Sequence, residues 1–96
     1  MLFVISAKDK PDSLNLRMNT RPAHLEFVKA TGVVRLAGPF LDAAGQMIGS
    51  LFIVEAADLE AAKAWHAADP YVKAGLFQSS ELLPWRVAAN FCNATL

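Results

Sequence analysis

The sequence predicts an α+β domain in which one four-stranded antiparallel sheet carries both helices on one face. Four apolar or β-branched segments alternate with two helical patterns in the order β-α-β-β-α-β, the ferredoxin-like arrangement. The chain has 96 residues, which suits a single domain. Hydrophobic residues make up 54% of it, against about 45–50% in an average soluble domain. This excess predicts a buried surface in addition to the core.

The chain begins with a strand and then turns polar. Residues 2–7 form a short apolar run with β-branched and aromatic side chains, which is typical of a strand. A polar loop follows. Asp12 or Ser13 can cap a helix, because apolar and basic residues then recur at spacings of three and four up to residue 21.

Pro22 leaves two alternatives for this helical region. Proline is tolerated in the first turn of a helix, and Thr20 before it is a good N-cap. The segment is therefore either one helix kinked near Thr20, or a short helix followed by a second one over residues 21–31. Gly32 is expected to end it in the left-handed conformation.

Two strands joined by a short turn form the middle of the chain. Residues 33–41 and 48–56 have the composition of strands, and the turn at 42–46 contains Asp42 and a glycine. Pro39 lies inside the first of these strands. Because proline cannot donate a hydrogen bond to a neighbouring strand, this strand is expected at an edge of the sheet.

The second helix is expected over residues 58–68, with Asp58 as its N-cap. Asp69-Pro70 ends this helix, and Asp69 can cap one further turn that Gly75 closes. His66 lies off the apolar stripe, so we expect it to be solvated. The stripe expected to face the sheet consists of Ala61, Ala62, Trp65 and Ala68.

The last strand is expected over residues 77–87, and Pro84 near its end again indicates an edge position. The domain therefore spans residues 1–87, and residues 88–96 are a C-terminal tail of small and apolar residues. Both helices cover one sheet face only, yet strands such as residues 51–54 are continuously apolar. A second copy of the chain packing sheet to sheet, as a homodimer, would cover the other face.

Charge and cysteine content narrow the class of protein. Nine basic and nine acidic residues cancel, and no run of Lys or Arg exists, so nucleic acid and anionic membranes are not expected partners. A single cysteine, Cys92, rules out an internal disulfide. A free thiol suits a reducing cytoplasm, and no segment has the pattern of a signal peptide or membrane span.

Several segments, in order and over nearly the whole chain, resemble the YciI-like (YCII-related) proteins. The most specific are the Arg-Pro-Ala-His and Ala-Asp-Pro-Tyr segments. The segments that carry the resemblance are Leu2-Phe3-Val4-Ile5, Asp12-Ser13-Leu14, Arg17, Arg21-Pro22-Ala23-His24-Leu25, Ala37-Gly38-Pro39, Gly49-Ser50 and Ala68-Asp69-Pro70-Tyr71-Val72-Lys73-Ala74-Gly75.

The resemblance implies a ferredoxin-like fold that dimerises through its sheet as an α/β barrel. It also implies a pocket with a histidine and an aspartate proposed as catalytic, which fall on His24 and Asp69. One relative is a dehydrochlorinase of chloroaromatic compounds, and the wider superfamily includes lactone isomerases and small oxygenases. The short hairpin at residues 42–46 departs from members with a longer loop there, which would wall the pocket.

Residue chemistry allows both a catalytic and a structural role for this pair. His24 can exchange a proton near neutral pH, and Asp69 can fix its tautomer. On a continuous helix Arg17, Arg21 and His24 share one stripe, so the arginines could bind an anion. Alternatively, His24 merely packs and Asp69 only caps a helix. Both roles of Asp69 are compatible if one oxygen caps while the other faces His24.

Three further residues are candidate substrate-binding positions: Gly38, Ser50 and Tyr71. Gly38 would let a ligand approach the backbone, but it could also be an edge-strand kink. Ser50 and Tyr71 could donate hydrogen bonds, or simply pack. No metal site is expected, since His24 and His66 lie on different helices without supporting ligands. Phosphate-binding loops are absent, and we expect no cofactor.

Two hypotheses follow for function. The first is a cofactor-free enzyme in which His24 and Asp69 carry out elimination, isomerisation or lactone chemistry on a small aromatic or anionic metabolite. The second is a non-catalytic dimer that binds a small ligand or assists another enzyme. The environment of His24 discriminates them: one ring nitrogen on Asp69 and the other facing an open cavity favours the enzyme.

Overall fold

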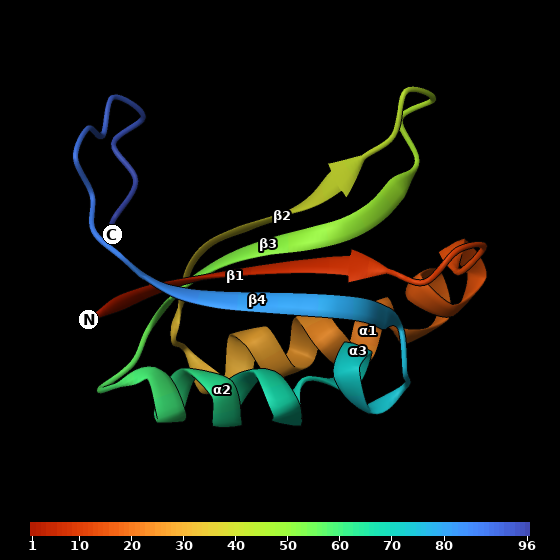
Figure 1. Ribbon diagram of the computed structural model, residues 1–96, viewed down its shortest axis with the longest axis horizontal. Helices are drawn as coiled ribbons and strands as arrows, with labels where there is room; N and C mark the ends of the chain where they lie inside the picture. The colour runs from red at the N-terminus through yellow and green to blue at the C-terminus, as the bar shows by residue number, and fades with distance from the viewer.

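The computed structural model describes residues 1–96 and has the predicted order of elements, with one additional short helix (Figure 1). Each strand differs from its predicted limits by no more than two residues at either end. The elements are β1 (Leu2–Asp9), α1 (Leu14–Thr31), β2 (Val34–Leu41), β3 (Met47–Glu55), α2 (Leu59–Ala68), α3 (Pro70–Lys73) and β4 (Phe77–Trp85).

The sheet is antiparallel throughout, in the strand order β2-β3-β1-β4. The ferredoxin-like prediction is therefore confirmed. Pro39 lies on β2 and Pro84 on β4, and these are the two edge strands, as their missing N–H groups predict. The central strands β1 and β3 contain no proline.

All three helices lie on one face of the sheet (Figure 1). Because side chains alternate between the faces of a strand, only every second residue of β1 points at the helices. Phe3 and Ile5 are buried there, whereas Ser6 and Lys8 on the opposite face are exposed. The core is completed by residues of β3 and α2, namely Phe52, Val54 and Ala62.

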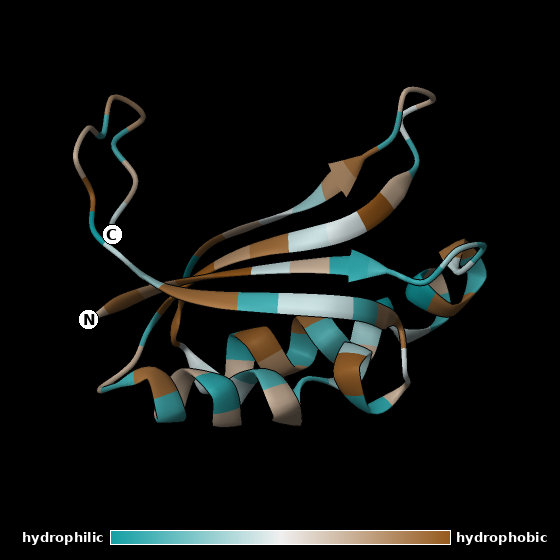
Figure 2. Cartoon of the chain, viewed as in Figure 1, coloured by the Kyte–Doolittle hydropathy of each residue, from teal (hydrophilic) through white to brown (hydrophobic).

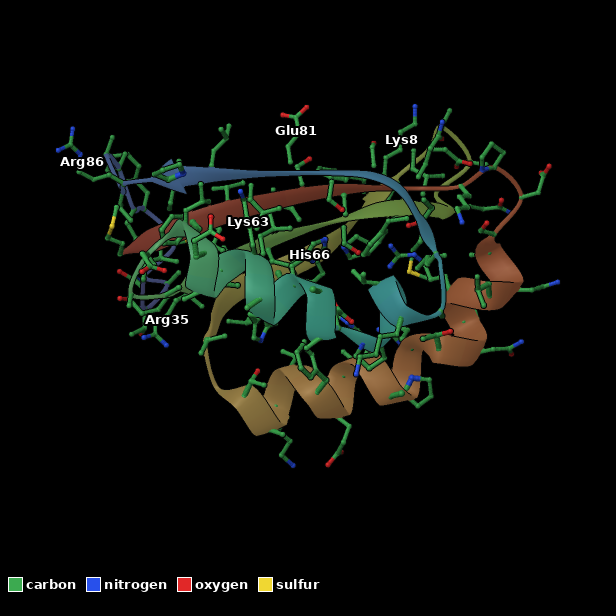
Figure 3. All side chains as sticks on the ribbon, turned by 60° about the horizontal axis from the view of Figure 1, so that its bottom comes forward. Lys8, Arg35, Lys63, His66, Glu81 and Arg86 are labelled. Atoms are coloured by element: carbon green, nitrogen blue, oxygen red, sulfur yellow. The ribbon has the colours of Figure 1, made fainter.

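No element covers the opposite face, from which Lys8 and Glu81 project (Figures 1 and 3). Apolar side chains are also exposed on it: Leu36 is 47% and Leu83 59% accessible. Hydrophobic residues recur along β2 and β3 in Figure 2. The tail after β4 leaves the sheet on this side and has no helix or strand. Part of the apolar excess therefore lies on this face.

α1 is one continuous helix, which decides between the two alternatives for residues 14–31. Pro22 lies inside it, and Thr20 is not an N-cap. Pro22 lacks the N–H that would bond the carbonyl of Met18, but both residues are exposed, so water can reach that carbonyl. Gly32 ends the helix at φ 67°, as predicted. Neither α1 nor any other helix is both long and apolar enough to cross a membrane.

The face of α2 that meets the sheet differs from the predicted stripe. Ala61 is exposed, while Ala62 and His66, one turn apart, are buried. His66 is bonded through Nε2 to Ser80 Oγ of β4 at 2.8 Å, so the prediction of a solvated His66 is wrong. The Ser80 hydroxyl on β4 gives the buried imidazole a hydrogen-bond partner, so His66 can be buried although its polarity predicted exposure to solvent.

Gly49 permits a close approach of β3 to β1. A Cβ atom at this position would lie 2.5 Å from the carbonyl oxygen of Ala7 and 3.0 Å from the ring of Phe40. The carbonyl belongs to the backbone of the paired strand and cannot move independently of the sheet. A side chain at residue 49 would therefore separate the strands beside Ser50, which is part of the site described next.

Candidate functional site

A cavity of about 150 Å³ lies between α1, β2, β3 and α3. Six of the seven predicted site residues line it, and the seventh, Asp69, lies behind His24. The predicted residues on its wall are Arg17, Arg21, His24, Gly38, Ser50 and Tyr71. Leu25, Met47 and Phe52 supply apolar surface. The cavity therefore combines a cationic and polar wall with an apolar one, a combination that is common in small-molecule sites.

His24 and Asp69 meet although they are 45 residues apart in sequence. His24 Nδ1 lies 2.8 Å from Asp69 Oδ1, and both side chains are buried. An ionised carboxylate only accepts hydrogen bonds, so Nδ1 is the donor and Nε2 of the neutral ring carries the lone pair. Nε2 has no partner within the chain and is not sealed from solvent. The free nitrogen is therefore available at the cavity wall.

Asp69 also caps α3. Its Oδ1 accepts a hydrogen bond from the backbone N–H of Tyr71 at 2.9 Å, as the Asp-Pro pattern predicts. The expectation that the two carboxylate oxygens divide these roles is wrong, because Oδ1 serves both His24 and Tyr71. Oδ2 is buried and has no partner. The cap holds the carboxylate in place, so the backbone of α3 positions the partner of His24.

Two aromatic rings hold the imidazole of His24. The Tyr71 ring stacks on it with centroids 4.0 Å apart and planes inclined by 15°, and Phe52 contacts it at 5.5 Å. Burial raises the pKa of the Tyr71 phenol, and the positive charges of Arg17 and Arg21 only partly oppose this. The phenol therefore remains protonated near neutral pH and can act as a hydrogen-bond donor.

Arg17 is held by a carboxylate that sequence reasoning missed. Its Nε and Nη2 donate to Asp9 at 2.7 and 2.9 Å, and Nη2 also donates to Ser50 Oγ at 2.7 Å. Burial acts to lower the pKa of Arg17, but the hydrogen bond and charge of Asp9 outweigh it and raise that pKa. The alternation Phe3, Ile5, Ala7, Asp9 on β1 was the available signal, since a buried carboxylate requires a cation.

Arg21 and Gly38 lie at the open part of the cavity. Arg21 is exposed and forms no ion pair within the chain, in contrast to Arg17. A Cβ at Gly38 would meet no atom within 4 Å, so packing does not require glycine there. Gly38 contributes backbone to the cavity wall, because its pairing with Leu51, which pairs with Ser6, places a side chain at residue 38 on the uncovered sheet face. Arg21 is thus the cation of this wall that an anionic ligand can reach.

Two further polar residues named from the sequence, Asp42 and Cys92, are not part of the cavity wall. Asp42 Oδ1 accepts the backbone N–H groups of Ala44 and Gln46, which confirms its interpretation as a turn residue. Cys92 is exposed in the tail. No group of three or more His, Cys, Asp or Glu side chains is arranged to hold a metal ion.

Comparison with known proteins gives related sequences over nearly the whole chain. Protein YciI of Escherichia coli O6:H1 is 42% identical over 95 residues, which cover 90% of this chain and 97% of that protein. An uncharacterized protein of Haemophilus influenzae is 35% identical with the same coverage. These relatives match this chain in length as well as in sequence.

Solved structures show the same fold. The structure of 5-chloro-2-hydroxyhydroquinone dehydrochlorinase (TftG) from Burkholderia phenoliruptrix AC1100, in complex with 2,5-dihydroxybenzoquinone, superimposes with a TM-score of 0.84. It is 34% identical, and the match covers 90% of this chain and 94% of TftG. An antibiotic biosynthesis monooxygenase, 17% identical, matches with a TM-score of 0.58 over 93% of this chain and 100% of its own, which reflects the fold alone.

The sequence motifs, the fold and these relatives agree on one family. The family model described as the YCII-related domain matches residues 1–86, which end just after β4. We conclude that the chain belongs to the YCII-related domain family.

Proposed function

We propose that this protein is an acid–base enzyme that transfers a proton on a small phenolic or anionic ring compound, with His24 as general base or acid. The observation that carries the proposal is the arrangement of the imidazole: Nδ1 on buried Asp69, and Nε2 unbonded at a cavity. Histidine is the side chain whose charge changes nearest to neutral pH. Asp69 orients the ring and stabilises the imidazolium that forms when Nε2 accepts a proton.

The size of the cavity and the similarity to TftG support a single-ring substrate. A cavity of about 150 Å³ in another protein holds benzene, and the cavity here has that volume. TftG is a dehydrochlorinase of a chlorinated hydroxyhydroquinone and was solved with a dihydroxybenzoquinone. An activated phenol or quinol with a leaving group on the ring therefore fits both the space and the relative.

In the proposed elimination, Nε2 of His24 removes one proton from the substrate while the leaving group departs with the electrons of its bond. The substrate loses the elements of HX, the proton resides on the imidazolium, and solvent then takes it up. Arg21 binds a ring oxygen that is already anionic in the bound substrate. General acid–base assistance contributes about 10²–10⁴-fold, so the proposal applies to activated substrates.

The proposed chemistry uses side chains of this chain only and requires no cofactor. The exposed thiol of Cys92 supports a reducing compartment, and we propose a cytoplasmic location.

We further propose that a second copy of the chain packs against the uncovered sheet face to form a homodimer. Leu36, Leu83 and Trp85 expose apolar surface there, and their burial would stabilise association. Analytical ultracentrifugation at micromolar concentration is expected to give a dimer for the wild type and a monomer for Leu83→Lys. A wild-type monomer would overturn this proposal.

A substrate screen tests the enzymatic proposal directly. Halogenated hydroquinones, activated phenols and lactones are incubated with wild type, His24→Ala and the surface control Lys63→Gln, and halide release and product absorbance are recorded. We expect turnover by wild type and Lys63→Gln and a loss of about 10²–10⁴-fold in His24→Ala. If ring compounds bind but all three proteins are equally inactive, the non-catalytic binding hypothesis is the better one.

A further inference from the structure

Both histidines of the chain are buried beside Asp69. His66 is only 7% exposed and precedes Asp69 by three residues, with its backbone carbonyl accepting the Asp69 N–H at 3.1 Å. Asp69 is the C-cap of α2, and its charge acts on the His66 imidazole. Phe52 contacts the rings of His24 and His66, at 5.5 and 6.4 Å. Asp69 thus has one histidine from α1 and one from α2 as neighbours.

Two buried side-chain atoms of the protein have no hydrogen-bond partner, and they belong to these neighbours: His66 Nδ1 and Asp69 Oδ2. Buried polar atoms in folded proteins are nearly always paired. The two atoms are also complementary, because a carboxylate oxygen accepts and a protonated ring nitrogen donates. Two buried polar atoms without hydrogen-bond partners lower the stability of the folded protein. A hydrogen bond between them, direct or through a water molecule, removes this penalty.

The hydrogen bond at the other ring nitrogen of His66, Nε2, is consistent with Nδ1 being a donor. Nε2 lies 2.8 Å from Ser80 Oγ, and a serine hydroxyl can donate to it. A neutral imidazole that accepts at Nε2 carries its proton at Nδ1. His66 is then a donor at the one atom that the chain leaves without a partner.

We propose that Asp69 is a carboxylate shared by both histidines, and that His66 is a positioning residue whose Nδ1–H reaches Asp69 Oδ2 through one internal water. Such waters bridge buried polar groups with two to four hydrogen bonds. The resulting series of hydrogen bonds runs from Ser80 through His66, water and Asp69 to His24. It ends at the Nε2 lone pair of His24 in the cavity. Because one carboxylate balances one positive charge, protonation of either imidazole opposes protonation of the other.

The charged groups around the two rings leave this coupling intact. Lys63 on α2 lines the same groove as His66, and β4 contributes neutral Ser80, since Glu81 projects from the opposite face (Figure 3). On the other side, Arg21 and Tyr71 surround His24, and Arg17 is neutralised by Asp9. Burial lowers the pKa of His66, which the charge of Asp69 only partly opposes. His66 is therefore uncharged at neutral pH.

Nuclear magnetic resonance of the protons bound to the imidazole nitrogens tests the coupling without any substrate. Removing His66 removes the bond to Oδ2, so the carboxylate charge concentrates on Oδ1 and the hydrogen bond from Nδ1 of His24 becomes stronger. We expect the Nδ1 proton signal of His24 to move downfield in His66→Gln. The matched control Lys63→Gln, which removes a charge from the same helix, is expected to leave it unchanged.

A double variant guards against misfolding of His66→Gln. His66→Phe with Ser80→Ala replaces both partners by apolar groups of similar shape, which proteins tolerate. The same downfield shift is expected there, and His24→Asn is expected to raise the pKa of His66. If the Nδ1 proton signal of His24 in the double variant matches that of wild type, the inference is overturned.

The effect of His66 on turnover rests on the proposed function, but the coupling does not. Inactivity of the wild type on every substrate would remove the enzymatic proposal while the shift of the Nδ1 proton signal persists. Activity that depends on His24, together with an unshifted Nδ1 proton signal in the variants of His66, would remove this inference alone.

Discussion

Arg17 and Asp9 form a buried, two-bonded ion pair, with Nε and Nη2 of the guanidinium 2.7 and 2.9 Å from the two carboxylate oxygens. The third bond, to Ser50, joins α1 to β3 beside the cavity. Since Asp9 already balances the charge of Arg17, Arg17 serves to fix α1 against β1 and β3 at the wall of the cavity. Arg21 also lines the cavity but forms no ion pair within the chain.

Asp9→Asn is expected to destabilise the protein by about 3–5 kcal/mol, because it leaves the Arg17 guanidinium buried without its counter-ion. Urea unfolding followed by circular dichroism measures the change. Glu60→Gln is the control, since its ion pair with Lys63 is exposed and long at 3.6 Å, and less than about 1 kcal/mol is expected. Equal effects of the two substitutions would contradict the structural role of Asp9.

Asp69→Asn is expected to lower kcat by about 10²–10⁴-fold on any substrate that depends on His24. The amide carries no charge to stabilise the imidazolium, and its NH₂ group can donate to Nδ1 and so select the wrong tautomer. Steady-state kinetics give kcat, and the nitrogen chemical shifts of His24 report the tautomer. A variant with normal kcat and an altered tautomer would show that Asp69 has no part in proton transfer.

Arg21→Gln is expected to raise KM for an anionic substrate by about 10–100-fold and to change kcat little, because a charge-assisted hydrogen bond contributes about 1.5–3 kcal/mol. Arg35→Gln is the matched control, since Arg35 lies at the end of the sheet away from α3 (Figure 3). Neither substitution should change KM for a neutral analogue with the same ring. If both variants raise KM equally, Arg21 makes no direct contact with the substrate.

His66 is expected to make the stability of the wild type sensitive to mild acid. Burial lowers its pKa in the folded protein below the unfolded value of about 6.5, so the unfolded chain binds the proton first as pH falls. The full contribution is therefore present above about pH 6.5 and is lost as pH drops toward the folded pKa. Urea unfolding at several pH values should show a smaller loss in the His66→Phe, Ser80→Ala double variant. If the free energy of unfolding depends on pH in the same way in both proteins, this prediction is wrong.

Local sequence pattern predicted most of the fold. Alternation within strands, the helical spacing of Arg17 and His24, and the two edge prolines depend only on near neighbours and on covalent geometry. For the same reason Asp69 was identified as a cap from the proline that follows it. These features persist wherever the segments pack, which is why a single sequence is enough to predict them.

Tertiary structure alone decided which groups share a hydrogen bond. Asp9 became the partner of Arg17, one oxygen of Asp69 took both bonds, and His66 turned inward to Ser80. Each of these depends on the distance and angle between separate elements, to within a few tenths of an ångström. Hydropathy and spacing carry no information at that precision. The sequence by itself therefore determined the family, the fold and the residues of the pocket, and the packing of α1, α2 and α3 on the sheet determined how their charges are paired.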